Sequence, residues 1–205
     1  SQVESLPRIL ASLAQWLSWA SQPELAPRGA TLLLAQVPES ALRAAFAAAL
    51  AQSEARPRSN TFAELPDCVP HAIRALAALP DDPQAQRAVF ACMALASFGP
   101  EGRRALLEER CVGLRDAMAA AARRPRLPDV QAWALALLAV CAPELPRDAD
   151  GAKLAWDGVA SCAGAFRYFR NAPWVLERSA HTLVRLLGAF PRRVATAAAA
   201  KRMRE

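Results

Sequence analysis

The chain has 205 residues, of which 54% are hydrophobic and 21% charged, so it is too apolar to stay disordered and long enough to bury a substantial core. Its longest apolar runs fall short of the roughly 20 residues that a membrane-spanning helix needs, and we therefore expect no membrane span. The net charge of +6 is carried almost wholly by arginine, with Lys153 and Lys201 as the two lysines, and on its own it is a weak argument for a nucleic-acid partner.

The first predicted elements are helices, because apolar residues recur at helical spacing and no stretch shows sustained strand-like alternation. A triplet of helices is expected over residues 7–20, 27–37 and 39–53. Residues 56–69 contain the turn-forming sequence RPRSNTFAELPDCV and predict an irregular stretch, followed by a single helix over 70–79.

Three prolines then head three strongly apolar helical stretches, at positions 83, 128 and 173. Proline suits the first turn of a helix, where its missing amide hydrogen would have had no partner. These three prolines are evenly spaced, with an interval of 45 residues from each one to the next. A spacing of this length is typical of helical-repeat proteins.

The segments between these prolines predict a repeated plan of three helices, long, short and long. After the first long helix, Gly99 and Pro100 start a short helix, and a break at the Cys-Val-Gly of residues 111–113 starts a longer one that runs to position 124. The next unit is expected to repeat the plan, with a short helix within 144–156 and a longer one over 157–170.

This pattern resembles the armadillo and HEAT families of helical repeats. The sequence VQAWALALLAVCA (residues 130–142) is similar to the first helix of an armadillo repeat, and WDGVASCAGAFRYF (156–169) is similar to the third. The resemblance implies an all-α fold, a right-handed α-solenoid of armadillo-like three-helix repeats forming a single domain over 1–205. Its units would cover about 5–54, 69–79 (incomplete), 83–124 and 128–170, with a terminal cap over 173–203.

No arrangement of residues predicts catalysis or a cofactor, since the glycine-rich phosphate loops and the nucleophile and metalloprotease motifs are missing. Cys68 and His71 have the spacing of two ligands on one helical face, but zinc needs four, so we expect no metal site. The cysteines are odd in number and scattered among apolar residues, which favours core packing in a reducing, intracellular compartment, either cytoplasm or the interior of an organelle. Most of the tryptophans are likewise expected in the core.

One internal echo predicts a binding surface. The sequences ALRAAFAA, AIRALAAL and GLRDAMAA place Arg43, Arg74 and Arg115 at matching positions of the predicted third helices. In an armadillo array these helices line the concave face, so the three arginines would form a basic column. The alternative is that they are ordinary surface arginines whose stems cover apolar seams. The sequence therefore predicts a non-enzymatic protein-interaction or scaffold module that binds a protein with an acidic segment or belongs to a larger assembly. An RNA-binding helical-repeat protein is the second hypothesis.

Overall fold

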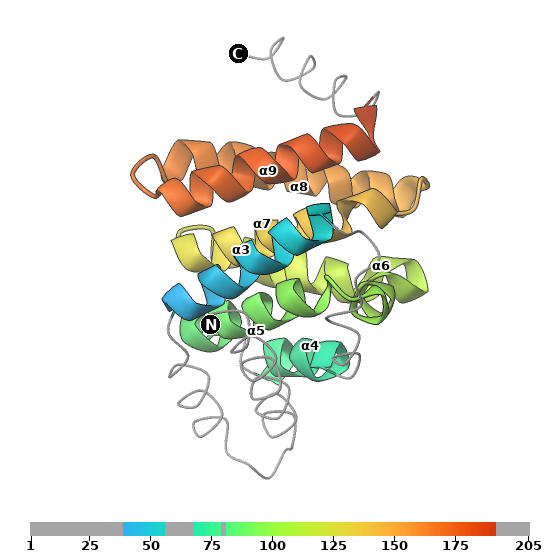
Figure 1. The fold of residues 1–205 in the computed structure, drawn as a ribbon, viewed down its shortest axis with the longest axis horizontal. Coiled ribbons are helices and arrows are strands. Elements are labelled where there is room, and N and C mark those ends of the chain that lie inside the picture. Colours follow the sequence, from blue (N-terminus) through green and yellow to red (C-terminus); the bar gives the residue numbers. More distant parts are fainter. Residues whose placement is uncertain (1–38, 56–67, 79–80, 192–205) are drawn as a thin grey trace. The chain divides into compact units, whose positions relative to one another are not determined.

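The computed structural model describes residues 39–55, 68–78 and 81–191, and every described element is helical (Figure 1). The chain divides into two compact units, Ser1–Leu106 and Leu107–Glu205. The all-α class predicted from the sequence is confirmed for the described residues. The helices predicted over 7–20 and 27–37, the irregular stretch over 56–69 up to position 67, and the part of the terminal cap beyond position 191 lie outside them.

The first unit contains α3 (Glu39–Ala55), α4 (Cys68–Ala78), α5 (Pro83–Ala96) and the start of α6 (Pro100–Ala122). Both α3 and α4 pack against α5, whose residues from Ala88 to Ala96 are all buried. From α3, Phe46 is fully buried and meets the ring of Phe98 edge to face, with the ring centres 5.2 Å apart. A helix buried around its whole circumference is therefore the centre of this unit.

The boundary between the units falls within α6, which does not run regularly. Arg110 and Cys111 have φ angles of 61° and 62°, in the left-handed region that residues with a side chain rarely adopt. α6 nevertheless runs as one helix from Pro100 to Ala122, so the prediction of a short helix followed by a separate long one is wrong here, and a local distortion of the backbone lies where the break was predicted. It is made by Arg110 and Cys111 and not by Gly113, because no described glycine has a positive φ.

The second unit is built around α7 (Pro128–Cys141), which is followed by a short 3-10 helix (Ala142–Glu144), α8 (Ala149–Tyr168) and α9 (Pro173–Ala189). Every residue from Val130 to Ala139 is buried, since α8 and α9 both pack against α7 and against each other. On α8, Cys162 lies in the same core cluster as Leu135 of α7 and Val175 of α9. The most apolar helix is again the central one.

The predicted helix starts are confirmed. Pro83, Pro128 and Pro173 are the first residues of α5, α7 and α9. At the first of these starts, the carboxylate of Asp82 accepts hydrogen bonds from the amides of Gln84 and Ala85, at 2.9 and 3.0 Å, and so caps the helix. The 45-residue spacing read from the sequence is therefore a spacing of real helix starts.

The predicted plan of a short and a long helix over residues 144–170 is wrong. A single helix, α8, runs through Trp156, Asp157 and Gly158, where a break was expected. A β-carbon on Gly158 would lie 2.4 Å from a methyl carbon of Leu138 and 3.0 Å from one of Leu186. This glycine thus allows α8 to pack closely on its neighbours and keeps a helical backbone, so one continuous helix replaces the predicted short and long pair.

Candidate functional site

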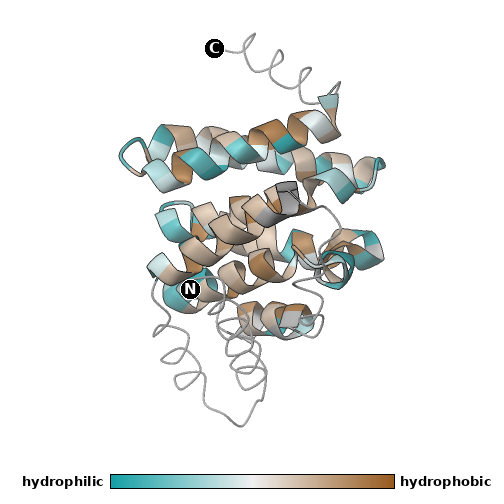
Figure 2. Ribbon diagram, in the orientation of Figure 1, coloured by the Kyte–Doolittle hydropathy of each residue, from teal (hydrophilic) through white to brown (hydrophobic). Residues whose placement is uncertain are grey.

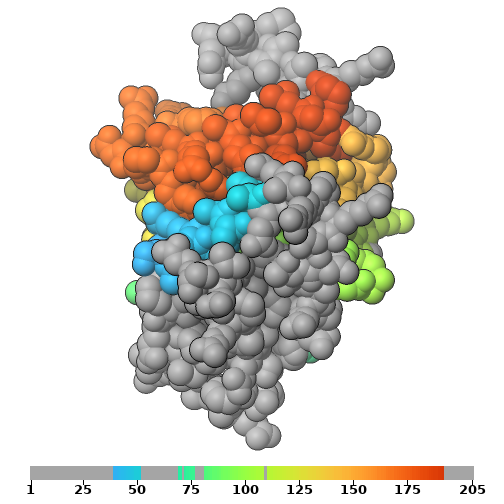
Figure 3. All heavy atoms as spheres, in the orientation of Figure 1, coloured from blue at the N-terminus to red at the C-terminus, as the bar shows by residue number. Residues whose placement is uncertain are grey.

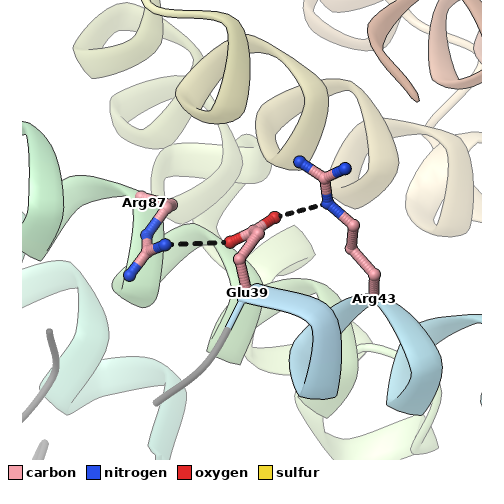
Figure 4. Close-up of polar contacts among 3 residues, drawn as sticks. All are labelled: Glu39, Arg43 and Arg87. Carbon is pink, nitrogen blue, oxygen red and sulfur yellow. Dashed lines mark hydrogen bonds and ion pairs between the residues drawn. The ribbon is translucent and has the colours of Figure 1, made fainter. Parts of the chain in front are cut away.

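The three predicted partner-binding arginines occupy different surroundings. Arg43 lies on α3 and is held by Glu39 of the same helix, with 2.8 Å between its Nε and a carboxylate oxygen. The other oxygen of Glu39 accepts from Arg87 of α5 at 3.2 Å, so this carboxylate bridges two guanidinium groups (Figure 4). The side chains of Glu39 and Arg87 are largely buried. This bridge therefore ties α3 to α5 inside the first unit.

Arg74 and Arg115 are both exposed, on α4 and on the second half of α6. A carboxylate oxygen of Asp150, near the start of α8, lies 3.5 Å from a terminal nitrogen of Arg115. Arg43 and Arg74 belong to the first unit and Arg115 to the second. The alignment of the three in one basic column thus stays a prediction, and an acidic partner would compete with Glu39 for Arg43 and with Asp150 for Arg115.

The buried cysteines are poor nucleophiles. Cys92, Cys111, Cys141 and Cys162 are free thiols inside the protein, as the sequence predicted for this residue type. Burial raises the pKa of the Cys162 thiol to about 12. Burial is also the main cause that raises the pKa of Cys111, with a further contribution from the nearby carboxylate of Asp148. Both thiols therefore stay protonated at neutral pH, and a thiol is far less reactive than a thiolate.

The described part of the chain offers neither a metal site nor a membrane-spanning helix. No three His, Cys, Asp or Glu side chains gather there in a way that could hold a metal ion. The side chains of Cys68 and His71 lie outside the described residues. None of the described helices combines the length and the hydrophobicity needed to cross a bilayer.

An apolar stripe on the outer side of α9 is the feature that the sequence analysis missed. Val184 and Leu187 are 67% and 43% exposed, the exposed Ala180 lies one turn before Val184, and Leu176 is half-buried on the same side. The half-buried Leu183 lies at the edge of this side and also packs against the core cluster. Successive members are three or four residues apart, so they share one face of the helix. We call these five residues the α9 stripe. In the space-filling view α9, in orange to red, forms part of the surface (Figure 3).

The side of α9 next to this stripe is buried in the core. Val175, Ser179, Thr182, Leu186 and Ala189 lie there, again three or four residues apart. The apolar surface of α9 is therefore wider than the side that its own unit buries. The spacing was visible in the sequence PWVLERSAHTLVRLLGA, but the sequence did not say which of the two sides faces the core.

The tryptophans divide in the same way. Trp133 is fully buried and meets Trp174 edge to face, with ring centres 5.5 Å apart, as expected of core residues. Trp156, however, is exposed on α8. Apart from Val112 on α6, all of the large hydrophobic side chains that are exposed in the described residues lie on α8 and α9.

Comparison with known proteins gives no match, since no protein-family model, no curated protein and no solved structure is significantly similar to this chain.

Proposed function

We propose that this protein is a non-enzymatic interaction module that binds another protein through the α9 stripe. The observation that carries the proposal is the exposure of Val184 and Leu187, which are members of the α9 stripe. Scattered apolar residues are normal on a protein surface, whereas an apolar patch on one helix face is typical of a binding site.

The shape of the stripe favours a helix as the element that covers it. Its members follow the i, i+4, i+7, i+8 and i+11 spacing by which one helix packs its ridge into the groove of another. Ala180 and Gly188 are exposed beside the larger residues, and a β-carbon at Gly188 would have nothing within 4 Å. Small residues at these positions let a partner helix approach closely while Val184 and Leu187 fill the seam.

The proposal includes the armadillo-like architecture that the sequence predicts. Helix starts at intervals of 45 residues and central helices buried on all sides are expected of stacked helical repeats, in which each unit buries its apolar face against the next. In such an array an apolar helix face at the surface is one that a further unit would cover. The α9 stripe is then the place where a partner continues the stack, and Arg43, Arg74 and Arg115 remain proposed contacts for an acidic segment of a partner.

The test compares Val184→Glu with Val112→Glu, because both replace an exposed valine by the same acidic residue in the second unit. Partners are captured from an extract of the source cells with the full chain, and binding of each purified candidate is then measured by calorimetry. We expect the Val184 variant to bind at least about tenfold more weakly than the wild type, since a carboxylate would be buried without a partner. The Val112 variant should bind normally. Equal binding by wild type and both variants would reject the α9 stripe as the interface.

A further inference from the structure

A cluster of arginines lies at the end of the second unit where α7 and α9 begin. The turn before α7 carries Arg123, Arg124 and Arg126, and the turn before α9 carries Arg170, with Arg167 in the last turn of α8. All but Arg124 are exposed.

Packing in the core brings the two turns to the same end of the unit. Trp133, in the second turn of α7, contacts Trp174 in the first turn of α9. Ala132 of α7, Ala165 of α8 and Val175 of α9 lie in one buried cluster, against which Phe169 and Ala172 of the second turn also pack. Figure 1 shows the two turns on the same side of the unit, and Figure 2 shows both in the teal of hydrophilic residues.

The turn before α7 is also held in place by a buried side chain. The side-chain amide nitrogen of Gln131, Nε2, donates to the backbone carbonyl oxygens of Ala121 and Arg124, at 2.8 and 3.2 Å. These bonds fix the turn to α7 and occupy carbonyl oxygens at the end of α6 that would otherwise add negative partial charge there. The guanidinium groups are thus presented from an anchored backbone.

Few negative charges oppose these arginines. No Asp or Glu occurs between Asp116 and Asp129, or between Asp157 and Glu177. The carboxylates nearest to the two turns along the sequence are Asp129 in the first turn of α7 and Glu177 in the second turn of α9, and Glu177 pairs with Arg178. The residues before α7 and α9, Leu127 and Ala172, provide no side-chain cap, so the positive ends of two helix dipoles face the same region.

Two exposed aromatic rings flank Arg167 in the sequence. Phe166 and Tyr168, in the last turn of α8, are 40% and 59% exposed. The guanidinium carbon of Arg167 lies 5.8 Å from the centre of the Tyr168 ring. Exposed rings beside arginines are the combination by which proteins bind single strands, because guanidinium groups pair with phosphates while the rings stack on unpaired bases.

We propose that this end of the second unit binds single-stranded nucleic acid, with the exposed Arg123, Arg126, Arg167 and Arg170 on the phosphates and with Phe166 and Tyr168 on the bases. The sequence suggested the same ligand class for Arg43, Arg74 and Arg115, but this site consists of other residues and is independent of the α9 stripe. An acidic peptide would use the guanidinium groups and gain nothing from the rings. A duplex would likewise hide its base faces, so the rings favour a single strand.

The experiment measures binding of the full chain to fluorescein-labelled oligouridylate of 15 nucleotides, by fluorescence anisotropy at several salt concentrations. Each phosphate contact of a single strand adds about 0.7 to the slope of log affinity against log salt. We expect a slope of about 3 for the wild type, and a slope lower by about 1.4 in each of Arg123→Gln/Arg126→Gln and Arg167→Gln/Arg170→Gln. Arg104→Gln/Lys153→Gln changes the net charge equally at exposed positions elsewhere and should leave the slope unchanged.

Tyr168→Ala separates base stacking from charge. It should weaken oligouridylate binding at least about fivefold without changing the salt slope, because one stacked base is lost and no phosphate contact is. Oligothymidylate of the same length tests DNA, and binding to either strand supports the proposal. Three results would overturn it: no binding at low salt, equal affinity for a 15-base-pair duplex, or a Tyr168 variant that binds like the wild type. If polyglutamate displaces the oligouridylate and Tyr168→Ala does not change its affinity, the site is instead one for acidic peptides.

Discussion

The hydroxyl oxygen of Thr182 on α9 lies 2.9 Å from the carbonyl oxygen of Leu135 on α7, in the core of the second unit. It also lies 2.7 Å from the carbonyl oxygen of Arg178, one turn back on its own helix. The single hydroxyl hydrogen is therefore placed between two acceptors on two helices. This is a polar link between elements that otherwise meet through apolar side chains.

Thr182→Val should consequently lower the free energy of unfolding by about 1 kcal/mol, since a methyl group replaces a buried donor of similar size. Ser179→Ala provides the control, because the hydroxyl of Ser179 bonds to Val175 of its own helix. That change should alter stability by less than about 0.5 kcal/mol, because alanine's helix propensity offsets the lost bond. Urea denaturation measures both, and equal losses would show that the link between the helices contributes nothing.

The two glycines of α8 at positions 158 and 164 should respond in opposite ways to alanine. A β-carbon at Gly164 would have nothing within 4 Å, so Gly164→Ala should stabilise the protein by about 0.5–1 kcal/mol through helix propensity. At Gly158 the added carbon would overlap Leu138 in the core, and overpacking of this kind costs about 1–3 kcal/mol. Thermal unfolding of the two variants should show melting temperatures on either side of the wild type. A stabilised Gly158 variant would contradict the close packing of α8 on α7.

Cys162 should make the protein less stable in alkali. Its folded pKa of about 12 lies above the ordinary value of 9.0, so the contribution of the neutral thiol is complete below pH 9. As the pH rises from 9 towards 12, the unfolded chain loses this proton before the folded one, and stability falls by about 1.4 kcal/mol per pH unit. Cys162→Ala removes this dependence. Denaturation at pH 8 and pH 10 gives the free energy of unfolding of both proteins. Between these two pH values the wild type should lose more of it than the variant does. Equal losses would argue against a buried neutral thiol.

The bridge from Glu39 to Arg43 and Arg87 should matter more than a similar pair at the surface. Glu39→Ala leaves the largely buried Arg87 without this carboxylate and should cost about 1–2 kcal/mol. Glu101→Ala also removes an acidic residue from the first turn of a helix, but its pair with Arg104 is exposed and should contribute at most about 0.5 kcal/mol. Chemical denaturation at low and high salt compares the two. If both substitutions lower the free energy of unfolding equally, the bridge between α3 and α5 adds no more stability than a surface ion pair.

The sequence predicted helix starts better than helix continuity. Proline and its fixed φ act locally, so Pro83, Pro128 and Pro173 marked the starts of three helices correctly. Whether a glycine ends a helix depends on its neighbours in space, and Gly158 continues α8 because Leu138 and Leu186 lie against it. No local pattern contains that information.

The same limit applies to the candidate sites. The pair of Glu39 with Arg43 was readable as an i, i+4 spacing, but the contact of Arg115 with Asp150 joins residues far apart in the chain. The arginines before Pro128 and before Pro173 were visible as two separate groups. Only the packing of α7 against α8 and α9 shows that they share one end of a unit.

The burial of the central part of α7 has a consequence for how the chain is made. Synthesis proceeds from the amino end, so α7 leaves the ribosome before α8 and α9, which cover it, have been translated. During that interval the apolar residues from Val130 to Ala139 have no partner helices in their own unit. A nascent chain at this stage is a substrate for chaperones that hold exposed hydrophobic segments. A stop codon placed between α7 and α9 should therefore yield aggregates, however well the first unit has folded.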